Sequence, residues 1–125
     1  MIAVDTSSVI AWLQGDGGAD ITRLEEALTS KKLALPPPVA AELLSWPKAS
    51  PALRSTLARL QPLPIAEGFW ERAGASRRFL LEKGFKGRFA DALIAQCCID
   101  SDVALIARDA DFRHFARHCG LKLAV

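Results

Sequence analysis

Four acidic residues stand beside apolar runs, where an ionised carboxylate is costly to place. Asp5 and Asp109 each end a short apolar run, while Glu42 and Asp91 interrupt apolar stretches with helical spacing. Such a carboxylate costs several kcal/mol unless a basic partner, backbone donors or a bound cation compensates it. No equally regular set of basic residues accompanies the four acids, so their pattern predicts a cation site.

Oxygen ligands alone are typical of sites for hard cations such as Mg²⁺ and Mn²⁺. Acids contributed by several separate elements leave coordination positions open for water and for phosphate oxygens. Such a site can activate a water molecule and neutralise the charge that develops on a phosphodiester. The four acids therefore predict metal-assisted chemistry on a phosphate ester.

Each acid also has an ordinary structural interpretation. Asp5 could cap a helix, Asp109 could form a turn, and Glu42 or Asp91 could simply be solvated. For any one acid alone this interpretation is preferred, whereas the set of four favours the cation site. Asp111 is assigned to the structural side, because it stands where the last helix needs an N-cap.

The composition indicates one ordered globular domain over residues 1–125. The chain has 125 residues, 50% of them hydrophobic, and its net charge of +2 is too small to predict a polyanionic partner without local clustering. Two of its three cysteines, Cys97 and Cys98, are neighbours that cannot easily bridge each other within a helix, which favours a reducing compartment. No stretch resembles a signal peptide or a membrane span, so we expect a cytoplasmic protein.

Short apolar segments that alternate with helical patterns predict an α/β fold. We expect strands at residues 2–4, 33–35, 103–107 and 121–125. Helices are expected at about 7–13, from a cap at Asp20, from Pro38 to before Pro47, from Ser50, from Glu67 to Gly84, at 88–99 and at 111–118. Because parallel strands need crossovers that can hold a helix, the expected architecture is a three-layer α/β/α domain around a mainly parallel sheet of four to five strands.

Sites in open parallel sheets form outside the carboxyl ends of the strands. Asp5 and Asp109 both fall there, and they come close if the strands at 2–4 and 103–107 are neighbours. Asp91 lies at the border of an apolar helical stripe, and Glu42 is flanked by apolar residues on its own helix. The four acids are therefore expected to gather at one edge of the sheet.

Four segments carry a resemblance to a known family: IAVDTSSVIAWL with Asp5, LPPPVAAELLS with Glu42, GRFADALIAQC with Asp91 and ALIARDADFRHF with Asp109. In order and spacing they resemble the PIN-domain ribonucleases, and among these the VapC-type toxins of toxin-antitoxin modules. The resemblance covers nearly the whole chain. The chain departs from the family at Ala107, where a threonine is usual, which affects a local hydrogen bond.

The resemblance implies a metal-dependent endoribonuclease in which Asp5, Glu42, Asp91 and Asp109 hold one or two Mg²⁺ or Mn²⁺ ions. Ser7 matches the small polar residue that helps to order the site in the family. The implied reaction is attack of metal-activated water on an RNA phosphodiester, which leaves a 5′-phosphate and a 3′-hydroxyl. The family also implies a homodimer and a small antitoxin protein that inserts into the site.

A run of basic residues leads to Asp91 and could follow an RNA backbone, because phosphate contacts supply most sequence-independent affinity. An ordinary solvated helix face is an equally good interpretation. The run consists of Arg72, Arg77, Arg78, Lys83, Lys86 and Arg88. We expect Arg88, Lys86 and Arg108 to be the RNA-binding candidates, with Arg88 first because it is nearest in sequence to a predicted ligand.

Three alternatives compete with this interpretation. A phospho-accepting receiver domain has similar length and Mg²⁺ use, but it needs an acidic pair after the first strand and a lysine after a later one. A binding module could use the acids to hold a structural ion without turnover. Zinc bound by His114, His118 and Cys119 is disfavoured, because the chain has no other histidine and a pair of surface histidines suits a helix C-terminus.

Overall fold

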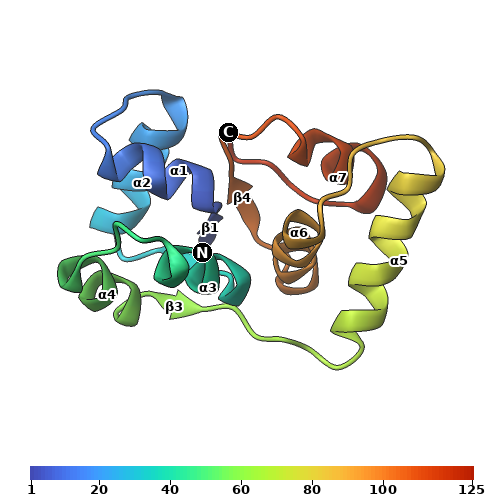
Figure 1. The fold of residues 1–125 in the computed structure, drawn as a ribbon, viewed down its shortest axis with the longest axis horizontal. Coiled ribbons are helices and arrows are strands. Elements are labelled where there is room, and N and C mark those ends of the chain that lie inside the picture. Colours follow the sequence, from blue (N-terminus) through green and yellow to red (C-terminus); the bar gives the residue numbers. More distant parts are fainter.

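The computed structural model describes residues 1–125 and is built on one parallel sheet (Figure 1). Its strands are β1 (Ile2–Val4), β2 (Leu33–Leu35), β3 (Gln61–Pro62) and β4 (Ala104–Ile106). They lie in the order β3-β2-β1-β4, and every neighbouring pair is parallel. The predicted α/β class is confirmed, and the strands that precede Asp5 and Asp109, central β1 and edge strand β4, are direct neighbours.

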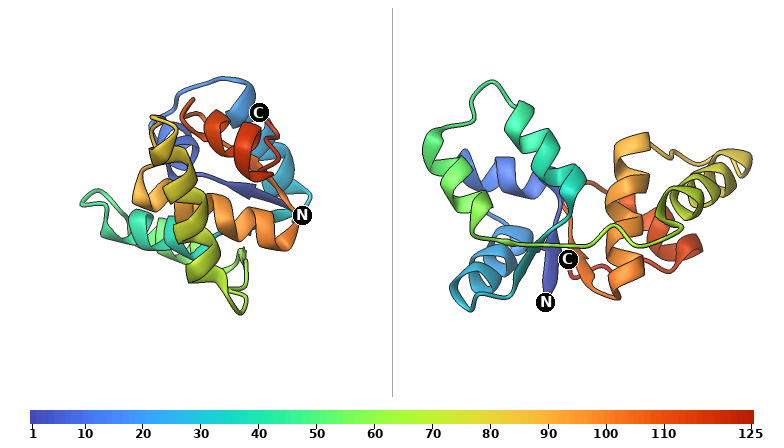
Figure 2. Two further views of the ribbon diagram at one scale, coloured as in Figure 1. Left: turned by 90° about the vertical axis from the view of Figure 1, so that its right-hand side faces the viewer. Right: turned by 90° about the horizontal axis from the view of Figure 1, so that it is seen from below.

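Seven helices cover the sheet. They are α1 (Thr6–Leu13), α2 (Ala19–Thr29), α3 (Pro37–Ser45), α4 (Pro51–Ala58), α5 (Phe69–Glu82), α6 (Phe89–Ser101) and α7 (Phe112–Cys119). Figures 1 and 2 show α1 and α2 on one side of the strands and α5, α6 and α7 on the other. Helix α3 contacts both α1 and α6, so it joins the two sides. None of the helices is long and apolar enough to cross a membrane.

Strands β1 and β2 are buried along their whole length, while the edge strand β3 is exposed. Ala3, Val4 and Ala34 have no exposed surface, and small or β-branched side chains let helices approach the sheet closely. Helix α6 is buried on several sides at once, because α3, α5, α7 and β4 all contact it. This explains why its polar Gln96 is buried and why Asp91 lies among apolar neighbours in the first turn.

The structure corrects three local predictions. Residues 121–125 do not form a strand. Leu123 makes a single parallel bridge to Leu105, and isolated backbone hydrogen bonds to Leu105 and Ala107 hold the rest of the segment. The two-residue strand β3 was not expected, because Pro62 is a poor strand residue away from an edge, which is where β3 lies. Asp20 does not cap α2, since Gly18 occupies the N-cap and Asp20 is buried in the first turn.

The two histidines of α7 pack against one aromatic ring. His114 and His118 stack on Phe85 with ring centroids 4.8 and 5.0 Å away. Phe85 follows α5, so these contacts fix the end of α5 against α7. The histidine pair therefore has a packing role in this fold.

Candidate functional site

The sheet brings Asp5 and Asp109 to one edge. Strands β1 and β4 pair in parallel, with Val4 opposite Ile106, so their carboxyl ends lie side by side. The backbone N–H of Asp5 donates to the Ile106 carbonyl at 2.9 Å, which carries the pairing up to the acid itself. Asp109 follows three residues after the end of β4. The predicted neighbouring of the two strands is confirmed.

Asp5 is both a helix cap and a buried acid. Its Oδ2 accepts from the backbone N–H of Ser7 at 3.3 Å and from the Ser7 hydroxyl at 2.5 Å, which caps α1. The residue is only 4% exposed. Burial raises the pKa of Asp5, the hydrogen bonds from Ser7 and Thr6 lower it in part, and the charge of Glu42 raises it further. Ser7 thus orients the carboxylate, which agrees with its predicted place beside the first acid.

Asp91 is the most perturbed acid of the group. Burial raises its pKa to about 6, and the charges of Asp5, Asp109 and Glu42 act in the same direction against the opposing charge of Arg88. Its Oδ2 is buried and has no hydrogen-bond partner. A buried carboxylate oxygen that faces three other acids without a donor is the arrangement that a bound cation would stabilise.

Glu42 and Asp109 complete the group and have partners outside it. Glu42 is exposed on α3, and its Oε1 accepts from the Thr6 hydroxyl at 2.6 Å. Asp109 Oδ1 accepts from the backbone N–H of Asp111 at 2.9 Å, while its Oδ2 lies 4.0 Å from Arg88 Nη1. The turn interpretation of Asp109 is thus also realised. Asp111 occupies the N-cap of α7, but its side chain makes no capping bond, contrary to the prediction.

The four acids come from four elements and share one electrostatic environment. The chemistry of the donor set, oxygen only, fits Mg²⁺ or Mn²⁺, and the unpartnered Asp91 oxygen fits a missing positive charge. No three of the acids are close enough together to form a ready metal site. Like charges repel, and the hydroxyls of Thr6 and Ser7 already occupy two of the carboxylates. The residues therefore fit a hard cation in type and grouping, and their convergence on one ion stays a prediction.

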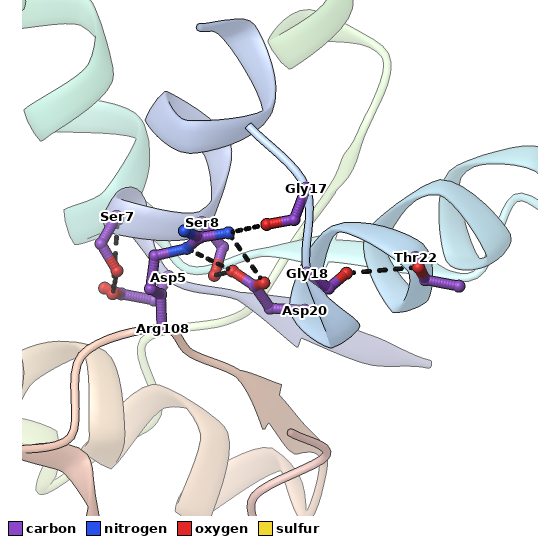
Figure 3. Close-up of polar contacts among 8 residues, drawn as sticks. All are labelled: Asp5, Ser7, Ser8, Gly17, Gly18, Asp20, Thr22 and Arg108. Carbon is purple, nitrogen blue, oxygen red and sulfur yellow. Dashed lines mark hydrogen bonds and ion pairs between the residues drawn. The ribbon is translucent and has the colours of Figure 1, made fainter. Parts of the chain in front are cut away.

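An ion pair between Arg108 and Asp20, which the sequence did not reveal, lies beside Asp5 (Figure 3). Arg108 donates from Nε and Nη2 to the two oxygens of Asp20, at 2.9 and 3.0 Å, and from Nη2 to the Gly17 carbonyl at 2.7 Å. The hydroxyl of Ser8 donates to Asp20 Oδ2 at 2.9 Å. One carboxylate therefore ties the residue before Asp109 to helix α1 and to the glycine-rich turn. This gives Arg108 a structural role, and its predicted contact with RNA stays untested.

Replacing Asp20 by asparagine should destabilise the fold by about 1–2 kcal/mol at neutral pH, because charge-assisted hydrogen bonds are lost. Burial alone would raise the pKa of Asp20, but hydrogen bonds from Arg108 and Ser8 outweigh it and leave the pKa below its ordinary 3.8. The stabilisation is therefore present above the unfolded pKa and is lost as pH falls through the folded one. Urea unfolding at neutral and acidic pH measures both effects.

Asp102→Asn is the matched control for this ion pair. Asp102 bonds Lys122 at 2.7 Å, but its side chain is 80% exposed, and asparagine tolerates its left-handed backbone. Exposed ion pairs contribute little to the free energy of unfolding, so the urea midpoint of Asp102→Asn should barely change. Equal losses from the two substitutions would show that the burial of Asp20 does not matter.

Some residues of the basic run are held in short ion pairs, whereas Arg88 makes only a long one. Arg72 is held by Asp100 in a two-pronged pair at 3.0 and 2.7 Å, and Arg78 pairs with Glu82 at 2.6 Å. Arg88 and Lys86 are exposed, and Arg88 reaches the acidic group through Asp109. The structure thus leaves the two candidates nearest Asp91 available to a polyanion.

Sequence reasoning missed Thr6 and Asp20. Thr6 follows Asp5 directly, and its hydroxyl reaches Glu42 across 36 positions, a contact that only the packing of α1 on α3 creates. Asp20 had a weak signal, since it is an acid beside a glycine-rich turn, but its partner Arg108 lies 88 positions away. Thr6 thus bonds one of the predicted acids directly, whereas Asp20 holds Arg108, the residue before Asp109.

Comparisons with known proteins agree with this geometry. The PIN domain family model matches residues 2–118. VapBC2 from Rickettsia felis, bound to a promoter DNA fragment, is similar with a TM-score of 0.75 and 24% identity over 98% of this chain and 97% of that one. FitAcB from Neisseria gonorrhoeae is similar with a TM-score of 0.71 and 16% identity, over 98% and 96%.

DNA-bound VapBC from Salmonella typhimurium gives a TM-score of 0.68 and 20% identity over 98% of this chain and 97% of that chain. A search of curated proteins finds no match. At these identities the structural likeness shows the fold, while the family match covers nearly the whole chain and all four acids. The chain therefore belongs to the PIN domain family.

Proposed function

We propose that this chain is a divalent-metal-dependent endoribonuclease and the toxin of a toxin-antitoxin pair. PIN domains are generally nucleases, which supplies the reaction class. The observation that carries the proposal is Asp91, whose Oδ2 is buried and unpartnered and whose pKa the surrounding acids help to raise. Such a buried, unpartnered carboxylate destabilises the fold, and a bound cation would compensate its charge.

Asp5, Glu42, Asp91 and Asp109 would hold one or two Mg²⁺ or Mn²⁺ ions, which when bound supply an activated water and neutralise phosphate charge. The residues around them set the geometry. Ser7 holds the Asp5 carboxylate in one orientation and Thr6 holds that of Glu42. Hydrolysis at this site is expected to leave a 5′-phosphate and a 3′-hydroxyl.

Arg88 would receive the RNA backbone. Its side chain is 65% exposed and its Nη1 lies 4.0 Å from Asp109 Oδ2, so a phosphate that it binds stands next to the acidic group. Lys86 is exposed two residues before it. Basic side chains that position phosphates carry no base preference, so this contact would orient RNA of any sequence.

A protein partner follows from the same proposal. The similar solved structures from Rickettsia felis, Salmonella typhimurium and Klebsiella pneumoniae are toxin-antitoxin complexes, and the first two hold DNA. We propose that this chain likewise binds a small antitoxin and forms a homodimer. Coexpression with the product of an adjacent small reading frame, followed by purification of the complex, tests this partner.

Removal of divalent metal should stop the reaction. We expect the purified chain to cleave single-stranded RNA in Mg²⁺ or Mn²⁺, and excess chelator to slow cleavage by at least about a hundredfold, because water activation and charge neutralisation are lost together. The measurement is the rate of product formation, with re-added metal as the control. Undiminished cleavage in chelator contradicts the proposal, and RNA bound but never cut would indicate a non-catalytic module.

A further inference from the structure

Phe89 is an exposed aromatic ring at the start of α6. At 63% exposed it has the largest exposed fraction among the large hydrophobic residues of the chain. It follows Arg88, whose Nη1 lies 4.0 Å from Asp109 Oδ2, and it shares the first turn of α6 with Asp91. Burial in the core of this chain does not account for the ring, since it remains open to solvent at the start of α6.

Arg77 holds the ring in place from one side. Its Nε donates to the Gly87 carbonyl at 2.7 Å, and its guanidinium carbon lies 5.9 Å from the centre of the Phe89 ring. A pinned guanidinium over an aromatic ring is a cation-π contact. It occupies one face of Phe89, so the rest of the exposed ring remains available.

The ring borders a pocket of about 410 Å³ on the outer side of α5. The volume is in the range of small-ligand sites. Its lining combines an aromatic ring, two guanidiniums, an aliphatic side chain, a carboxylate and one glycine: Phe89, Arg77, Arg78, Leu81, Glu82 and Gly74. A Cβ added at Gly74 would meet nothing within 4 Å, so the space over the helix is open.

We propose that this pocket binds an unstacked nucleobase of single-stranded RNA, with the base against Phe89, and the inference rests on the proposed ribonuclease function. Aromatic rings and guanidinium planes are the surfaces on which unpaired RNA bases stack. Two arginines, Arg77 and Arg78, line the pocket with the single acid Glu82, which pairs with Arg78, so the lining keeps one net positive charge for a polyanion.

The position of the pocket selects the nucleotide. Phe89 and Asp91 share the first turn of α6, but at about 100° per residue they point about 200° apart around the helix. The base pocket and the carboxylates therefore lie on opposite sides of one helix end, about 10 Å apart, which is the width of a helix. While the scissile phosphate lies at the carboxylates, the pocket would therefore bind the base of a neighbouring nucleotide.

The test measures binding without cleavage, in the Asp91→Asn protein, with short single-stranded RNA that carries 2-aminopurine. Stacking quenches this base, and Phe89→Ser should remove the quenching and weaken binding about 5-fold to 100-fold, the usual contribution of one stacked base. Phe89→Trp should retain both signals. Trp70→Ser is the matched control, because Trp70 is also exposed, at 62%, but does not line the pocket, and binding should stay within about twofold.

A second variant fills the pocket and keeps the ring. Gly74→Leu places a side chain in open space on α5, where leucine favours the helix more than glycine, so the fold should tolerate it. It should weaken RNA binding as Phe89→Ser does. Unchanged binding in both variants overturns the base pocket, and so does a change from dimer to monomer in Phe89→Ser, which would assign the ring to a protein interface.

The pocket and the nuclease can fail separately. If the unmodified protein cleaves RNA but Phe89→Ser does not weaken RNA binding, the base pocket is wrong and the nuclease proposal is retained. If binding and quenching depend on Phe89 but no divalent metal supports cleavage, the pocket stands and the nuclease is wrong. If the Asp91→Asn protein binds no RNA, the pocket is wrong, and cleavage by the unmodified protein decides the nuclease.

Discussion

Asp91→Asn is expected to make the metal-free protein more stable at about pH 8, by about 2 kcal/mol, while it ends RNA cleavage. The pKa of Asp91 rises from the ordinary 3.8 to about 6, because burial and three neighbouring acids disfavour its charge. That difference corresponds to about 3 kcal/mol, and solvent screening of a half-buried group reduces it. Asparagine keeps the shape, removes the charge and can donate hydrogen bonds to the remaining carboxylates.

The sign of the pH dependence follows from the raised pKa. The folded state holds the Asp91 proton more tightly than the unfolded chain, so this contribution to stability is fully present below 3.8 and is lost as pH rises through about 6. The advantage of Asp91→Asn should therefore vanish near pH 4 and reach its full size above about pH 7. Urea unfolding in chelator at several pH values measures it.

Asp100→Asn is the control on the same helix and should act in the opposite direction. Asp100 accepts from Arg72 and Gln96, and the hydrogen bond from Arg72 is the main reason that its pKa lies below the ordinary value. Removing its charge at neutral pH breaks these bonds and destabilises the fold. Loss of stability in both variants at about pH 8 would show that Asp91 is an ordinary paired acid.

Mn²⁺ should raise the melting temperature of the unmodified protein and leave that of Asp91→Asn nearly unchanged. At a hundred times the dissociation constant, a cation bound only to the folded state adds about 2.7 kcal/mol, or about 10 °C for a domain of this size. The physical reason is that the cation supplies the positive charge that Asp91 and its neighbours lack. Thermal unfolding across a metal titration measures the shift.

The same titration should depend on pH. A bound cation needs Asp91 ionised, so binding should strengthen as pH rises through about 6. Asp102→Asn provides the matched control, because Asp102 is exposed, pairs with Lys122 and lies outside the acidic group. It should retain the full metal-dependent shift. Equal shifts in Asp91→Asn and the unmodified protein would place the cation elsewhere.

The central parts of the fold follow from sequence because they rest on local patterns. The apolar runs at 2–4 and 33–35 and the last one before Asp109 form strands β1, β2 and β4, since only buried parallel strands suit such short continuous runs. Once β1 and β4 pair, Asp5 and Asp109 both lie at the carboxyl ends of neighbouring strands. The predicted strand at 121–125 is wrong because its few backbone hydrogen bonds to β4 and Ala107 amount to one bridge, Leu123 to Leu105, and not to a continuous ladder.

The support of the site depends on contacts between distant residues, which no local pattern encodes. Arg108 was predicted only as an RNA-binding candidate, and the bonds from its guanidinium to Asp20 and the Gly17 carbonyl were not foreseen. Its contact with RNA stays a prediction. The sequence also could not predict that Asp91 Oδ2 lacks a hydrogen-bond donor. Residue spacing places a side chain on one face of a helix, but it does not show which donors lie near that side chain. Partners of this kind are set by side-chain packing across the whole domain.

The most direct test of the central claim is to map RNA 5′ ends in cells that express either the unmodified chain or Asp91→Asn. A carboxylate site that drives RNA hydrolysis predicts new 5′-phosphate ends with the unmodified chain and none with Asp91→Asn, although both proteins accumulate and fold. The same new ends in both cultures, or no new ends in either, would contradict it.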